Sequence, residues 1–133
     1  MNIFLSYRFT GEDPKELDIT LGKIISILRK SGNTVYCSIE DEAWFQEKKH
    51  SNREIMERAF IKLDESDTIL AFIKLDEKSE GMLVEIGYAI AKKKRFALAI
   101  KKGVKTTSIA EMADPKIEFE NLDDLCDQLK TFQ

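Results

Sequence analysis

The chain has 133 residues, of which 43% are hydrophobic and 34% are charged, and its formal net charge at pH 7 is −3. Interspersed charges of both signs exclude a fibrous or disordered chain, and the slightly acidic balance offers no basic surface to a nucleic-acid polymer. A chain of this length buries about two-thirds of its unfolded surface. We therefore expect a single domain over residues 1–133 with one core that can support a cleft.

Cysteine and histidine usage argues against disulfides, metal sites and a histidine-based triad. Cys37 and Cys126 are far apart and form no CxxC pattern, so we expect no disulfide framework and no zinc site. His50, the only histidine, lies in a polar stretch that predicts a solvent-exposed side chain. We expect neither a metal ion nor another cofactor, and a reducing, cytoplasmic setting.

The N-terminal segment MNIFLSY enters a strand directly and shows no export signal. Elsewhere no apolar run approaches the roughly 18 residues that a membrane span requires. We therefore expect no contact with a membrane.

Strand and helix patterns alternate in the first half of the chain. Residues 2–6 predict a strand, and apolar residues at helical spacing then predict a helix that ends at the stop signal of residues 31–33. These apolar residues are Leu17, Leu21, Ile24, Ile25 and Leu28. Residues 35–38 predict a second strand, and the polar stretch from about 40 to 52 predicts a loop. A second amphipathic helix is marked by Ile55, Met56, Ala59, Phe60 and Leu63.

The second half continues this alternation. Residues 68–73 form a continuous apolar run bounded by charges, which is typical of a strand covered on both faces. After it we predict a helix over 79–91, a strand over 96–100, a short helix near 108–112, a strand over 116–119 and a final helix from about Leu122.

The alternation favours an open parallel sheet joined by short, right-handed crossovers. We predict an α/β fold of the flavodoxin/Rossmann-like type, with a five-stranded parallel sheet of order 2-1-3-4-5 and helices on both faces. Ligands of such sheets bind beyond the carboxyl ends of the strands, where the strand order reverses. That point lies between the first and third strands, so the loops at residues 6–13 and 74–81 matter most.

These two loops carry groups that can bind an anion. After the first strand, Ser6 offers a hydroxyl, Arg8 offers paired N–H donors for a phosphate or carboxylate, and Gly11 allows close backbone approach. After the third strand, Ser79 is a candidate N-cap and Gly81 lies within the first helical turn. The free N–H groups and the positive dipole end of that helix would face the same crevice as Arg8.

A carboxylate, Glu85, interrupts the apolar run of the third predicted helix. Its spacing from Met82 and Ala89 puts Glu85 on or beside the buried stripe of that helix. Desolvation there would raise the pKa of Glu85, and a hydrogen bond from a neighbouring hydroxyl would restrain the rise. Such a carboxylate can serve as a nucleophile or a base. The spacing equally allows a half-buried glutamate that pairs with a lysine.

Residues 79–89, SEGMLVEIGYA, resemble the signature S/D-x-G-x-x-x-E-x-G-x-A of the nucleoside 2-deoxyribosyltransferase family and its relatives, the nucleotide N-glycosidases. The resemblance implies that Glu85 attacks the anomeric carbon of a sugar and forms a covalent glycosyl-enzyme, which water or a second base resolves. Ser79 would help to hold the substrate, and serine at this place looks more like the glycosidases that act on nucleoside 5′-monophosphates.

The segment FLSYR at residues 4–8 is similar to the first loop of the same glycosidases. The resemblance places Ser6, Tyr7 and Arg8 near the substrate, a nucleotide or nucleoside. With Gly11, Ser79 and Gly81 they form the predicted substrate- and phosphate-binding set. Family members commonly assemble as dimers or larger homo-oligomers in which neighbouring chains complete the sites, so the resemblance also implies a homo-oligomer.

One position departs from the family pattern. Counting back without gaps from Asp67, the place where these enzymes usually carry a catalytic aspartate is Ala59. Alanine can neither bond to a substrate nor transfer a proton. The candidates to replace the aspartate are Glu54, Glu57 and Asp64, if the helix is displaced. A catalytically silent relative that binds a nucleotide is therefore one alternative function.

The segment NIFLSYR at residues 2–8 also looks like the first strand and loop of TIR domains. TIR domains share the flavodoxin-like architecture, and several of them cleave the N-glycosidic bond of NAD with a glutamate. A TIR-like signalling or NAD-cleaving module is thus a second alternative, although TIR domains usually show a different pattern around their glutamate. The base, the sugar and the acceptor stay open.

Overall fold

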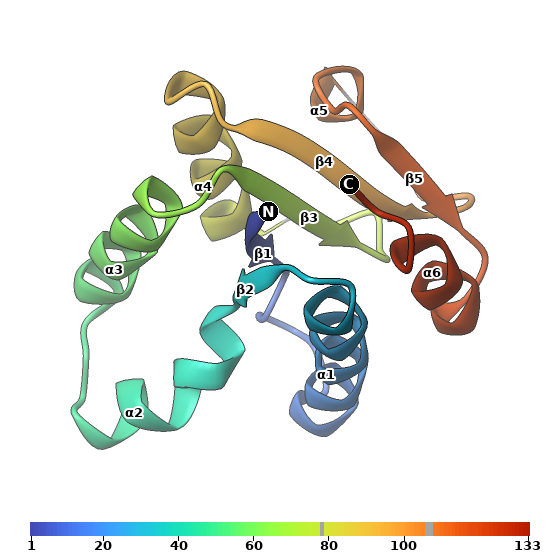
Figure 1. The fold of residues 1–133 in the computed structure, drawn as a ribbon. Coiled ribbons are helices and arrows are strands. Elements are labelled where there is room, and N and C mark those ends of the chain that lie inside the picture. The colour runs from blue at the N-terminus through green and yellow to red at the C-terminus, as the bar shows by residue number, and fades with distance from the viewer. Residues whose placement is uncertain (78, 106–107) are drawn as a thin grey trace.

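The computed structural model describes residues 1–77, 79–105 and 108–133. Its strands are β1 (Asn2–Ser6), β2 (Thr34–Tyr36), β3 (Thr68–Ile73), β4 (Arg95–Lys101) and β5 (Lys116–Phe119). Its α-helices are α1 (Pro14–Lys30), α2 (Glu42–Glu47), α3 (Asn52–Asp64), α4 (Glu80–Ala91), α5 (Ser108–Glu111) and α6 (Leu122–Leu129), and a 3-10 turn, η1, covers Ser38–Asp41. Strands and helices alternate as predicted (Figure 1).

The strands form one parallel sheet in the order β2-β1-β3-β4-β5, which confirms the predicted topology. β1 lies between β2 and β3, and its last residue, Ser6, pairs with Ala71 of β3. All six residues of β3 are buried. The strand order reverses between β1 and β3, so the carboxyl ends of these two strands form the expected ligand-binding edge.

Helices cover both faces of the sheet, which divides the core into two apolar clusters. Side chains alternate along a strand, so Ile3 and Leu5 of β1 pack toward α1 and α6, whereas Phe4 packs toward α3 and α4. In Figure 1, α1 and α6 lie on one side of the sheet and α3 and α4 on the other. The single predicted core is therefore two clusters, because the sheet separates them. Among the described residues, no helix is long and apolar enough to cross a membrane.

Local sequence signals explain where the helices begin and end. α1 begins after Asp13, whose side chain accepts from the backbone N–H of Lys15, and Pro14 is its first residue. It stops before Gly32, which adopts a positive φ of 94°, as the predicted stop signal requires. α3 begins with a capping box between Ser51 and Glu54.

The stretch from about 40 to 52 is the main departure from the predicted elements. Instead of a loop it contains η1 and the short helix α2. Phe45 of α2 is buried, and the ring of His50 packs against Trp44 at a centroid distance of 4.5 Å. His50 is therefore half-buried rather than solvent-exposed. β2 ends at Tyr36, two residues earlier than predicted, because η1 begins at Ser38.

Candidate active site

Glu85 lies on α4 beneath the carboxyl end of β1. Ser6, the last residue of β1, is buried, and its Oγ donates a hydrogen bond to Oε1 of Glu85 at 2.7 Å. The strand alternation that turns Phe4 toward α3 and α4 turns Ser6 to the same side. The end of β1 and the helix α4 are thus in direct contact through Ser6 and Glu85, both of which were predicted site residues.

Burial raises the pKa of the Glu85 carboxyl to about 7, and the hydrogen bond from Ser6 limits the rise. Both effects were expected from the apolar setting of the helix. In the described part of the chain, the hydrogen-bond partner of Glu85 is this serine hydroxyl and no lysine lies within ion-pair distance. A pKa near neutrality is suited to a general base, and the ionised form of the same carboxyl is the one that can act as a nucleophile.

The start of α4 has the geometry predicted for it. Ser79 is the N-cap, with extended backbone, and its Oγ accepts from the backbone N–H of Met82 at 3.3 Å. Gly81 follows in the first turn, where an added Cβ would lie 3.6 Å from Cε of Met56 and 3.7 Å from Oγ of Ser79. Those distances are ordinary contacts, so sterics alone do not demand glycine at this position.

Gly11 has a direct relation to Arg8. Its φ is +80°, in the left-handed region that favours glycine. A Cβ at Gly11 would lie 3.1 Å from Nη2 of Arg8, closer than most side-chain contacts allow. The absence of a side chain at Gly11 therefore makes room for the guanidinium.

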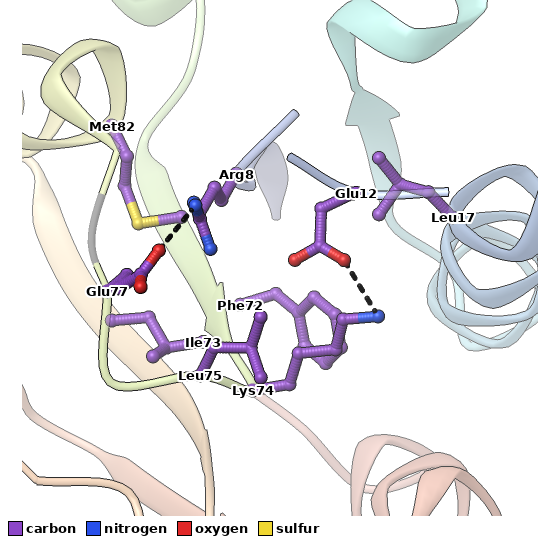
Figure 2. Close-up of a pocket in the computed structure, with 9 residues that line it drawn as sticks. All are labelled: Arg8, Glu12, Leu17, Phe72, Ile73, Lys74, Leu75, Glu77 and Met82. Atoms are coloured by element: carbon purple, nitrogen blue, oxygen red, sulfur yellow. Dashed lines mark hydrogen bonds and ion pairs between the residues drawn. The ribbon is translucent and has the colours of Figure 1, made fainter. Parts of the chain in front are cut away.

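Arg8 lines a small pocket at the carboxyl end of β3 (Figure 2). The lining residues are Arg8, Glu12, Leu17, Phe72, Ile73, Lys74, Leu75, Glu77 and Met82. Two ion pairs lie across the pocket from each other in Figure 2, Arg8 with Glu77 at 2.9 Å and Lys74 with Glu12 at 3.2 Å. The cavity that a water molecule can enter measures about 10 Å³, roughly room for one water. Of the predicted site residues, Arg8 lines this pocket, whereas Ser6, Ser79, Gly81 and Glu85 do not.

The side chain of Tyr7 packs on the opposite face of the sheet from that of Ser6. It is buried in the apolar cluster beneath α1, and its hydroxyl accepts from Oγ of Ser38 at 3.2 Å. Burial raises the pKa of this phenol above its usual value, and the charge of Glu85 adds to the rise. Tyr7 therefore packs on the α1 side of the sheet, whereas Ser6 and Glu85 meet on the other side.

Ala59 is buried in the cluster between the sheet, α3 and α4. The three acidic residues considered as replacements for an aspartate here have other partners. Glu54 belongs to the capping box of α3 and Glu57 pairs with Arg53 on the exposed surface. Asp64 lies at the far end of α3 and accepts from the Tyr88 hydroxyl. None of the three lines the pocket around Arg8.

Sequence reasoning missed Glu77, the partner of the predicted Arg8, and the whole of the second ion pair, Lys74 with Glu12. Glu12 and Lys74 lie in the two selected loops but are 62 positions apart, and Glu77 has no pattern that marks it. The only signal was their location after the first and third strands. Among the described residues, no group of three His, Cys, Asp or Glu side chains is arranged to hold a metal ion.

Solved structures with similar folds include an N-glycosidase and a 2-deoxyribosyltransferase. The CMP N-glycosidase BcmB of Clostridium botulinum has a TM-score of 0.75 at 17% identity, covering 99% of this chain and 100% of that one. The 2-deoxyribosyltransferase of Bacillus psychrosaccharolyticus has a TM-score of 0.71 at 17% identity, covering 100% and 93%. A conserved protein of Enterococcus faecalis V583 gives 0.60 at 12% identity, covering 98% and 97%. At these identities the likeness shows a shared fold.

No curated protein sequence matches the chain significantly. The family model for nucleoside 2-deoxyribosyltransferase, in contrast, matches residues 8–122. That span contains Arg8, Gly11, the whole of α4 and its Glu85, and it supports the first of the two resemblances seen in the sequence. Because the match covers most of the chain, the protein belongs to the nucleoside 2-deoxyribosyltransferase family.

Proposed function

We propose that the protein cleaves the N-glycosidic bond of a nucleoside 5′-monophosphate, by hydrolysis or base exchange, with Glu85 as the nucleophile. The observation that carries this proposal is the half-buried Glu85 carboxylate, held by Ser6 at 2.7 Å within the family's helical signature. The similar fold of an N-glycosidase that acts on CMP supports a nucleotide substrate.

The proposed reaction proceeds in two displacements. A carboxylate oxygen of Glu85 attacks the anomeric carbon, the bond from that carbon to the base nitrogen breaks, and the electron pair leaves with the base, which takes up a proton from water. Water or a second base then attacks the same carbon and loses a proton, while the carboxylate departs. Dividing one hard step into two easier ones is the advantage of a covalent intermediate. Ser6 orients the carboxylate for the first attack.

Arg8 and the start of α4 are the proposed phosphate-binding groups. A guanidinium can hold a phosphate through paired donors, and the first turn of α4 adds backbone N–H groups and the helix dipole. Nucleoside monophosphates should then bind more tightly than nucleosides by roughly 1.5–3 kcal/mol. Calorimetry with a nucleoside and its own 5′-monophosphate measures this difference, and equal affinity for the two would point to a nucleoside site instead.

A nucleotide-binding protein without turnover is the second candidate function. The observation that favours it is Ala59, which lies in the apolar core where the family usually has an aspartate. Since Glu54, Glu57 and Asp64 have other partners, none of them supports a proton transfer at the sugar.

The deciding experiment incubates the protein with nucleosides, nucleoside monophosphates and NAD, and detects the released base by chromatography. We expect release from a nucleoside monophosphate, and Glu85→Gln should reduce the rate by at least about three orders of magnitude. Glutamine keeps the shape of the side chain but cannot attack. Glu111→Gln, at an exposed position on α5, is the matched control and should keep the wild-type rate. Base release by Glu85→Gln at the wild-type rate would contradict the assignment of Glu85 as the nucleophile. If the wild type releases no base from any of the substrates, the second candidate function is favoured.

We also propose a homodimer or larger homo-oligomer in the cytoplasm. The outward side of α4 supports assembly because Leu83 and Val84 are 39% and 43% exposed, and apolar residues on a free helical face favour association. Two free cysteines, one of them the buried Cys37, support a reducing compartment.

A further inference from the structure

The guanidinium that the proposed function assigns to phosphate already holds an anion. Nη2 of Arg8 donates to Oε2 of Glu77 at 2.9 Å (Figure 2). The two side chains differ strongly in exposure, because Arg8 is 18% exposed and Glu77 is 80% exposed. Arg8 is thus part of the pocket wall, whereas Glu77 reaches to it from the solvent side.

Arg8 is the fixed member of this pair. Its guanidinium lies against the backbone of Gly11, where an added Cβ would be only 3.1 Å from Nη2. Glu77 has no comparable enclosure, and an ion pair with such an exposed partner contributes little to stability. An incoming anion can therefore replace the Glu77 carboxylate at Arg8 without moving the guanidinium.

The second ion pair of the pocket, Lys74 with Glu12, is less exposed to solvent than the pair of Arg8 with Glu77. Glu12 is only 9% exposed and Lys74 is 23% exposed, so both charges are largely withdrawn from water. Removing Glu12 from Lys74 would leave a charge without a partner in a poorly solvated place. Of Arg8 and Lys74, the cations among the described lining residues, Arg8 is the one whose carboxylate partner can be exchanged.

We propose that Glu77 is a specificity-determining residue that competes with the substrate phosphate for Arg8. While its carboxylate is on Arg8, the pocket admits about one water molecule. A ligand with a terminal phosphate supplies the anion that replaces Glu77, and a neutral sugar or nucleoside does not. This inference rests on the role of Arg8 in the proposed function. It adds Glu77 as the residue that makes the site select ligands with a phosphate.

The test measures binding of ribose 5-phosphate and of ribose by calorimetry, because neither compound has a glycosidic base to release. Glu77→Gln removes the competing charge and keeps the side-chain size. We expect this variant to bind ribose 5-phosphate about two- to ten-fold more tightly than the wild type, with a smaller gain at high salt. Ribose should show no gain. Glu111→Gln removes the same charge from an exposed position on α5, outside the proposed phosphate site, and should show a clearly smaller gain.

Four results would overturn the proposal. They are an unchanged or weaker affinity in Glu77→Gln, an equal gain in Glu111→Gln, a gain that persists when Arg8→Ala is added, and no measurable binding by any variant. The outcome is separate from turnover, because ribose 5-phosphate binding does not depend on Glu85 as a nucleophile. Base release can therefore fail while the competition at Arg8 holds, and the reverse is equally distinguishable.

Discussion

At the scale of single residues, the protonation of Glu85 links the candidate site to stability. Its pKa is raised to about 7 in the folded protein, whereas an unfolded glutamate titrates near 4.3. Between these values the folded state binds more protons than the unfolded state, so the free energy of unfolding falls as pH rises. The contribution of Glu85 to stability is complete below pH 4 and is lost by about pH 7.

This linkage predicts how Glu85→Gln behaves in denaturant. Glutamine cannot ionise, so the variant should gain stability over the wild type as pH rises from about 4.5 to 8. The full shift corresponds to about 4 kcal/mol, and partial exposure makes the gain smaller. Urea unfolding at pH 4.5 and at pH 8 measures it. A difference between the two proteins that does not change with pH would contradict the raised pKa.

Ser6→Ala tests the hydrogen bond to Glu85 directly. The bond favours the ionised carboxylate and so limits the rise in its pKa. Its loss should raise the pKa of Glu85 further, by about one unit. Carbon-13 NMR of labelled glutamate carboxyls can follow this titration, with Glu85→Gln to assign the resonance. Thr68→Ala, which changes another buried hydroxyl on the sheet, is the matched control and should leave the Glu85 titration unchanged.

At the scale of elements, the start of α4 combines a stabilising residue with one that weakens the helix. Ser79 caps the helix through the N–H of Met82, and Ser79→Ala should lower the free energy of unfolding by about 1 kcal/mol. Gly81→Ala should raise it by about 0.5–1 kcal/mol, because the added Cβ meets only ordinary contacts. Chemical denaturation measures both.

If Gly81 instead serves close approach of a phosphate, the stabilised variant should bind nucleoside monophosphates less tightly. Calorimetry on Gly81→Ala checks this second effect. Stability that falls on adding the methyl group would contradict the contacts around Gly81, and unchanged affinity would show that the glycine has no part in binding.

The elements that sequence predicted best are those with long, regular patterns. β3 is a run of six buried residues with charged flanks, and α4 carries both a cap and a family signature, so their bounds followed closely. α2 has only six residues, of which just Phe45 is buried, so it gave no helical periodicity. The pairing of Lys74 with Glu12, and of Arg8 with Glu77, depends on how distant loops meet. No local pattern encodes that meeting.

At the scale of the whole molecule, the outward side of α4 predicts the assembly state. Leu83→Glu introduces a charge on a side chain that is already 39% exposed, so the fold should tolerate it while association weakens. Sedimentation velocity should show smaller particles than for the wild type. Ile19→Glu, on an exposed position of α1, is the control and should sediment like the wild type. A wild type that sediments as a monomer would contradict the proposed oligomer.

The hydrogen bond between Ser6 and Glu85 joins residues 79 positions apart, and this separation orders events during synthesis. Ribosomes add about 5–20 residues per second, so Ser6 exists for roughly 4–16 seconds before Glu85 is made. β1 also cannot pair with β3 until residues 68–73 have been made. A nascent chain arrested before α4 therefore contains the first loop without its carboxylate, and the candidate site is complete only after α4 has been made.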